Sequence, residues 1–182
     1  MKQLGIALSF AVFILACQSG VKPAGDMNAM AVNRDTLLLR IKSLEQTLSE
    51  KKVVDYNSGG AMVQAYLDFF DHYPKDGLSA DFLFKAADVS MNLKQSEKAI
   101  ELFKKVVEFY PDYKKASFAL FLQAFVYETQ LHDLAQAKTI YNQVVEQYPN
   151  TKIADDAKAS VANLGKSDEE LIKELEKKNK AK

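Results

Sequence analysis

A Tyr-Pro dipeptide recurs at nearly constant intervals, and this spacing constrains the fold more than any other feature of the sequence. The pairs are Tyr73-Pro74, Tyr110-Pro111 and Tyr148-Pro149, and they are separated by 37 and then 38 residues. An offset of 38 also aligns further positions in chain order, namely Ala86 with Ala124, Leu93 with Leu131, Ala99 with Ala137 and Phe103 with Tyr141. So many matches at one offset indicate a repeated supersecondary unit.

Each unit is predicted to be a pair of α-helices. Before the second proline, apolar residues recur at spacings of three and four, as in one face of a helix: Ala99, Ile100, Phe103, Val106, Val107 and Tyr110. The proline then ends the helix, because the residue before it is forced out of the helical region. The full set of predicted helices is 34–51, 58–73, 77–92, 95–110, 112–131, 133–148, 150–164 and 167–179.

Three of these predicted helices carry further signals. Helix 34–51 has a narrow leucine seam, which suits either a short oligomerisation helix or the first half of a degenerate repeat. Helix 112–131 is apolar almost all round and is expected to be buried on every side. In helix 167–179, Ser167 and Glu170 form a capping box, and we expect this helix to end the stack.

The composition excludes several classes of function. Lys plus Arg and Asp plus Glu are both 24, so no strong electrostatic attraction to nucleic acid is expected. The single Cys and the two His rule out a cysteine-based zinc site and make a histidine metal centre implausible. No catalytic motif has the required spacing. We therefore predict a protein that is not an enzyme, with no catalytic residue, no metal and no cofactor.

The first sixteen residues read as a lipoprotein signal peptide. Lys2 gives a positive start, and residues 4–16 form an uncharged, mostly apolar run that is too short to cross a bilayer. The run ends at Ile14-Leu15-Ala16-Cys17, which resembles the bacterial lipobox. That resemblance implies lipidation of Cys17, which would become the first residue of the mature chain.

Residues 17–33 are predicted to be the lipidated cysteine and a flexible tether, because small residues, Pro23 and two glycines interrupt any periodicity. Residue 18 is Gln rather than Asp. By resemblance to the enterobacterial sorting rule, this favours the outer membrane, with the protein facing the periplasm.

The helix pairs resemble tetratricopeptide repeats. An alanine, an aromatic residue four positions later and a proline eight positions after that occur as Ala99, Phe103 and Pro111, and again as Ala137, Tyr141 and Pro149. The resemblance implies an all-α, right-handed solenoid of three to four helix pairs over 34–166, followed by a capping helix and polar tail over 167–182. Similar repeats occur in two periplasmic lipoprotein families, the helical-repeat subunit of the outer-membrane barrel-assembly machinery and the Tol–Pal coordinator.

In tetratricopeptide arrays the first helix of each pair lines a binding groove. When Ala86 and Ala124 are aligned with the family's small position, the predicted groove residues are Asp81, Phe84, Asp88, Met91, Leu122, Val126 and Thr129. Leu122 and Val126 also suit the core. Phe84, Asp88 and Met91 suggest an apolar patch around a carboxylate, which would suit a partner segment with a basic residue.

The resulting functional hypothesis is a membrane-anchored periplasmic adaptor that binds a protein or peptide in outer-membrane or envelope assembly. Two alternatives remain open. One is a structural lipoprotein that self-associates through helix 34–51, and the other is an accessory domain of a cell-wall enzyme.

Overall fold

The computed structural model describes residues 33–50 and 55–180, which form eight α-helices and no strand. The helices are α1 (Arg34–Ser49), α2 (Tyr56–His72), α3 (Ser79–Asn92), α4 (Ser96–Phe109), α5 (Ala116–Thr129), α6 (Leu134–Gln147), α7 (Lys152–Asn163) and α8 (Asp168–Lys180). Every helix predicted from the sequence is therefore confirmed. The signal peptide, Cys17 and the tether lie outside the described residues.

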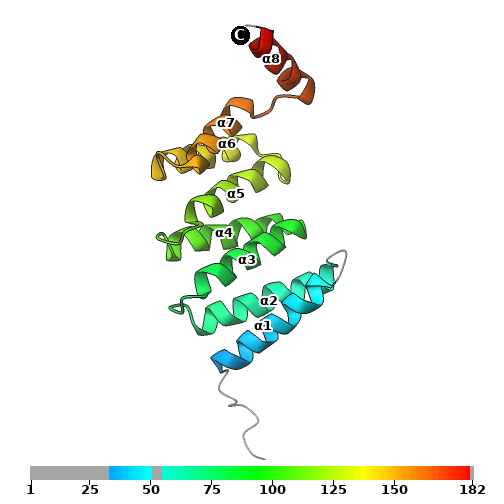
Figure 1. The fold of residues 1–182 in the computed structure, drawn as a ribbon, viewed down its shortest axis with the longest axis vertical. Coiled ribbons are helices and arrows are strands. Elements are labelled where there is room, and N and C mark those ends of the chain that lie inside the picture. Colours follow the sequence, from blue (N-terminus) through cyan, green and yellow to red (C-terminus); the bar gives the residue numbers. More distant parts are fainter. Residues whose placement is uncertain (1–32, 51–54, 181–182) are drawn as a thin grey trace, which may run out of the picture. The chain divides into compact units, whose positions relative to one another are not determined.

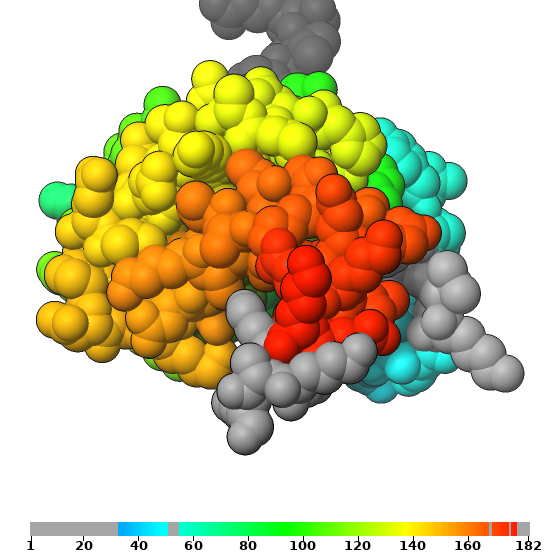
Figure 2. Space-filling view, turned by 90° about the horizontal axis from the view of Figure 1, so that it is seen from above, coloured from blue at the N-terminus to red at the C-terminus, as the bar shows by residue number. Residues whose placement is uncertain are grey.

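Helices α1 to α7 form a stack in which each helix packs on the next along the chain, and α5 also touches α7 (Figure 1). From the C-terminal end, α7 is seen lying directly against α6 (Figure 2). The all-α helical-repeat fold is therefore confirmed. None of the helices in the described ranges is long and apolar enough to cross a membrane.

The repeated alanines and aromatic residues lie where the sequence pattern predicts. Ala99 and Ala137 are fully buried, and so are Phe103 and Tyr141 one turn later on α4 and α6. A residue without a long side chain lets the paired helix approach closely, and the ring fills the space beside it. The Tyr141 hydroxyl donates a 2.7 Å hydrogen bond to Glu128, so its polar end is also satisfied.

The leucine seam of α1 packs inside the fold. Leu37 and Ile41 are buried in the same core cluster as α2 to α4, and Leu44 and Leu48 pack against it. Salt bridges fix the helix further, since Arg34 reaches Asp76 at 2.6 Å and Arg40 reaches Asp68 at 2.6 Å. Of the two readings of this seam, the structure supports the first half of a degenerate repeat.

The expectation that helix 112–131 is buried on every side is wrong. The helix begins at Ala116, because two successive turns follow Pro111, with Tyr113 N–H donating to the Tyr110 carbonyl and Ala116 N–H to the Tyr113 carbonyl. Phe118 is 37% exposed and Phe125 is 39% exposed. Neighbouring helices cover only part of α5, and one aromatic side of it faces solvent.

The α3–α4 pair and the α5–α6 pair differ by one residue in the turn that joins the two helices of each pair. After α3, the Gln95 N–H bonds to the Ser90 carbonyl five residues back, whereas after α5 the Asp133 N–H bonds to the Tyr127 carbonyl six residues back. The first helices therefore superpose at an offset of 37, and only the second helices at 38. In structural terms Ala124 corresponds to Ala87, so the predicted alignment of Ala86 with Ala124 is wrong by one residue.

The predicted capping box of the last helix is present. Ser167 N–H donates to Glu170 Oε2 at 2.9 Å, and Glu170 N–H donates back to Ser167 Oγ at 3.3 Å. These two bonds satisfy donors that the first turn of α8 would otherwise leave free.

Substitutions at the alanine and aromatic positions should separate buried from exposed sites. Phe103→Ala is expected to cost ~3–5 kcal/mol of unfolding free energy, because it leaves a cavity. Ala99→Leu is expected to cost ~1–3 kcal/mol by overpacking. The neighbouring Lys104 is exposed, so Lys104→Ala should change little. Urea denaturation followed by circular dichroism measures all three, and equal losses would contradict this assignment of the buried face.

Candidate functional site

The predicted groove residues of α3 occupy one side of that helix, but they differ in accessibility. Phe84 is only 6% exposed and belongs to the core cluster, whereas Asp81, Asp88 and Met91 are half-buried. Phe84 packs edge-on against Phe103 at 5.6 Å between ring centroids. Phe84 is therefore a structural support for this surface and offers little of its own area to a partner.

Asp81 already has partners within the fold. The Tyr113 hydroxyl donates to it at 2.9 Å, Lys85 lies 3.4 Å away and Lys115 lies 3.9 Å away. Burial alone would raise the pKa of Asp81, but the hydroxyl and the two ammonium groups outweigh burial and lower it. Asp81 therefore stays ionised and ties the turn before α5 to α3.

The surroundings of Asp88 differ from those of Asp81. It is half-buried one helical turn beyond Phe84, and its side chain makes no hydrogen bond or ion pair with any residue that the structure describes. Burial raises its pKa, and the charge of Lys115 offsets this only in part. An ionised carboxylate that is half-buried becomes more stable when an incoming cation pairs with it.

The predicted groove residues on α5 do not form a continuous surface. Leu122 and Val126 are buried in the core, and the Thr129 hydroxyl donates to the Phe125 carbonyl within its own helix. The cause is the one-residue error in alignment, because one residue rotates a helical position by about 100°. The core alternative for Leu122 and Val126 is the one that the structure supports.

At the correct offset of 37, the counterparts of the α3 residues on α5 are accessible. They are Phe118, Phe121, Phe125 and Glu128, of which Phe118 and Phe125 are exposed and the other two half-buried. The sequence contained the signal that would have found them, since the Tyr-Pro pairs that precede α3 and α5 are 37 residues apart.

Aromatic contacts join the two helices into one surface, which we call the α3–α5 face, defined by Asp81, Phe84, Asp88, Met91, Phe118, Phe121, Phe125 and Glu128. Phe84 stacks on Phe118 at 6.1 Å, and Phe118 stacks on Phe121 at 6.3 Å. The Lys115 ammonium lies 4.7 Å from the centre of the Phe84 ring. The α3–α5 face thus combines exposed rings with one carboxylate that has no partner.

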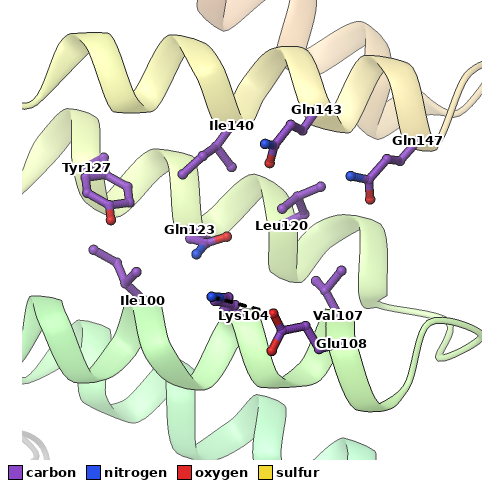
Figure 3. Close-up of a pocket in the computed structure, with 10 residues that line it drawn as sticks. All are labelled: Ile100, Lys104, Val107, Glu108, Leu120, Gln123, Tyr127, Ile140, Gln143 and Gln147. Carbon is purple, nitrogen blue, oxygen red and sulfur yellow. Dashed lines mark ion pairs between the residues drawn. The ribbon is translucent and has the colours of Figure 1, made fainter.

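A hollow lies on the other side of α5 from this face, between α4 and α6 (Figure 3). Its volume is about 530 Å³. Aliphatic side chains and three glutamine amides line most of it, and a Lys104–Glu108 ion pair of 3.6 Å lies at its α4 wall. We call this hollow the α4–α6 groove.

Neither surface has the donor set of a metal centre. Among the described residues, no group of three or more His, Cys, Asp or Glu side chains is placed to hold a metal ion. The groups left available to a ligand are aromatic rings, the Asp88 carboxylate and a set of amides.

Comparison with known protein families finds a match for two segments of the chain. Residues 81–113 and 118–151 match the sequence model of the tetratricopeptide repeat. In these two segments, which make up just over a third of its length, the chain is similar to that repeat. The two matches begin 37 residues apart and the second is one residue longer, which agrees with the extra residue in the turn after α5. No curated protein matches the sequence.

One solved structure shows the same fold, and a second is similar to part of the chain. The second tetratricopeptide domain of human RPAP3, solved by NMR in complex with the HSP70 peptide SGPTIEEVD, is 16% identical, with a TM-score of 0.51 over 74% of this chain and all of that domain. The first such domain of human RPAP3 is 20% identical, with a TM-score of 0.47 over 72% of this chain and 98% of that one.

The raised pKa of Asp88 predicts a pH-dependent cost to stability. Because its pKa is higher in the folded than in the unfolded protein, its destabilising effect is absent below the unfolded pKa of about 3.8 and fully present above the folded pKa. Asp88→Asn should therefore raise the melting temperature at pH 7 and leave it unchanged near pH 3. Thermal melts at both pH values test this, with exposed Asp112→Asn as the control. A lower melting temperature at pH 7 would mean that Asp88 has a stabilising partner.

Proposed function

We propose that this protein is a lipid-anchored periplasmic adaptor, which uses its α3–α5 face to bind a segment of a partner protein in outer-membrane or envelope assembly. The observation that carries the proposal is the Asp88 carboxylate, which is half-buried beside aromatic rings and has no partner among the described residues. A folded chain gains nothing from such a group by itself. A bound cation would offset the free-energy cost of burying the Asp88 charge.

The chemistry of the face specifies the partner segment. Phe118 and Phe125 lie seven residues apart on one side of α5 and can receive an apolar side chain, because exposed rings gain from desolvation. Asp88 can then pair with a Lys or Arg nearby in the same segment. The partner is thus an apolar segment with one basic residue.

The fold supports binding as the role of the protein. Tetratricopeptide repeats present a wide surface formed by successive first helices and do not themselves supply reactive groups. The RPAP3 domain with the same fold holds a peptide in its solved complex. We extend that general role, binding a protein segment, to this chain, and we derive the partner's chemistry from the α3–α5 face alone.

Self-association through α1 is the weaker candidate. Its apolar residues Leu37 and Ile41 are already buried against the rest of the fold. Using them for a dimer would require α1 to leave the stack, so we do not adopt this function.

Loss of partner capture is the first test. Phe125→Ala and Asp88→Lys should each abolish recovery of the partner in affinity capture from solubilised envelope, because the first removes an exposed ring and the second reverses the charge. Both should leave the fold intact, as judged by circular dichroism.

Phe109→Ala is the matched control, since Phe109 is an exposed ring, 60% accessible, on α4 outside the α3–α5 face. Unchanged capture by both test variants, or an equal loss in the control, would place the binding site elsewhere.

Membrane attachment is the second test. The sequence Ile14-Leu15-Ala16-Cys17 supports lipidation of Cys17, and a diacyl or triacyl group is enough to hold a folded domain on a membrane. Cys17→Ser should abolish metabolic labelling with palmitate and leave the unprocessed precursor. The unchanged protein should fractionate with the outer membrane. Normal processing and labelling of the serine variant would contradict a lipid anchor.

A further inference from the structure

The α4–α6 groove contains an amide that reaches the open groove and has no partner within the described residues. Gln123 of α5 lies in the middle of the groove and is only 8% exposed (Figure 3). Its side chain makes no hydrogen bond with any residue in the described part of the chain. Its amide atoms are not fully buried, so in the free protein they face the groove and can exchange water for a ligand's donor and acceptor.

The preceding repeat shows that the fold does not require this arrangement. At the offset of 37, Ala86 and Ser90 of α3 correspond to Gln123 and Tyr127 of α5. Ala86 and Ser90 are both completely buried, and the Ser90 hydroxyl bonds to the Ala86 carbonyl within the helix. In that repeat the two positions hold small, buried residues, whereas in the next repeat a glutamine and a tyrosine line the groove.

Two further amides border the same groove. Gln143 and Gln147 lie one turn apart on α6, and in Figure 3 both extend toward the space above α5. Neither side chain hydrogen-bonds to another described residue. Each glutamine offers an N–H donor and a C=O acceptor, and an extended peptide backbone presents the same two groups at every residue.

The remaining lining selects against other ligands. Ile100, Val107, Leu120 and Ile140 give aliphatic walls, which suit an apolar side chain better than a sugar ring. Lys104 is paired with Glu108 at 3.6 Å, so the groove has no net charge to attract an anion. From Leu120 to Tyr127 the groove follows α5 for about 10 Å, which is the length of about three residues of extended chain.

From these observations we propose that the α4–α6 groove binds a short, uncharged, extended segment of a partner protein, with its backbone bonded to the glutamine amides and an aliphatic side chain between α4 and α6. This site is separate from the α3–α5 face and does not depend on the proposed function. On α5 the two sites occupy opposite sides, with Phe118 and Phe125 on one and Gln123 and Tyr127 on the other.

The test uses the full-length protein in detergent and fluorescein-labelled, amidated pentapeptides of sequence Ser-Thr-Xaa-Thr-Ser, with Val, Ile or Leu at Xaa. Fluorescence anisotropy should show saturable binding of at least one peptide, with half-saturation at or below about 1 mM. The same peptide with N-methylated backbone amides should bind at least about ten-fold more weakly, because it has lost its N–H donors. This comparison needs no protein variant and so cannot be confused with a folding defect.

Gln123→Leu provides the second arm. It should weaken binding about ten-fold or more while the melting temperature stays within a few degrees of that of the unchanged protein, because the amide that is removed makes no hydrogen bond within the described part of the chain. Gln136→Leu is the control, since Gln136 is exposed on α6 and lies outside the groove. Asp88→Lys should leave peptide binding unchanged, which separates this site from the α3–α5 face.

Three results would overturn the proposal. They are the absence of saturation with all three peptides, equal binding of the N-methylated peptide, and full binding by the Gln123→Leu variant. Displacement of the peptide by a trimer of N-acetylglucosamine would assign the groove to glycan instead.

Discussion

The whole stack depends on one repeated contact, in which an alanine on the second helix of a pair allows close approach and an aromatic ring one turn later fills the remaining space. Ala99 with Phe103, and Ala137 with Tyr141, are completely buried at these contacts. Side chains as large as leucine at the alanine positions would separate the helix axes. Because the contact fixes how each pair packs, it also fixes which sides of the first helices remain accessible.

Helix α5 joins the two halves of this core. Leu122 and Val126 belong to the cluster built by α1 to α4, whereas Leu120 and Ala124 belong to the cluster built with α6 and α7. A helix that serves two cores needs apolar residues on more than one side, which explains its almost uninterrupted apolar sequence. It is covered on those sides only, so its aromatic side and the side that lines the α4–α6 groove stay accessible.

The sequence was sufficient to predict the helices, their pairing and the buried alanine and aromatic positions, because each follows from a local periodicity and from proline. The 38-residue offset, however, misplaces the α5 residues that correspond to the predicted groove residues of α3. A single extra residue in the turn before Asp133 separates the offsets of the first and second helices, and a one-residue error turns Val126 outward in place of Phe125. The burial of Phe84 was beyond the sequence altogether, since it depends on contacts with Phe103 on α4 and Phe118 on α5.

The two surfaces have a common physical origin. Elsewhere the fold satisfies several partly buried polar groups over long sequence distances, as when Lys85 bonds to Glu45 at 3.0 Å and Tyr141 bonds to Glu128. Asp88 and Gln123 receive no such partner from the part of the chain that the structure describes. Burial raises the pKa of Asp88, so its charged form is disfavoured in the free protein, whereas the Gln123 amide reaches the open groove. A ligand's cation would offset the cost of burying the Asp88 charge, and a ligand's hydrogen bonds would replace those of water at Gln123.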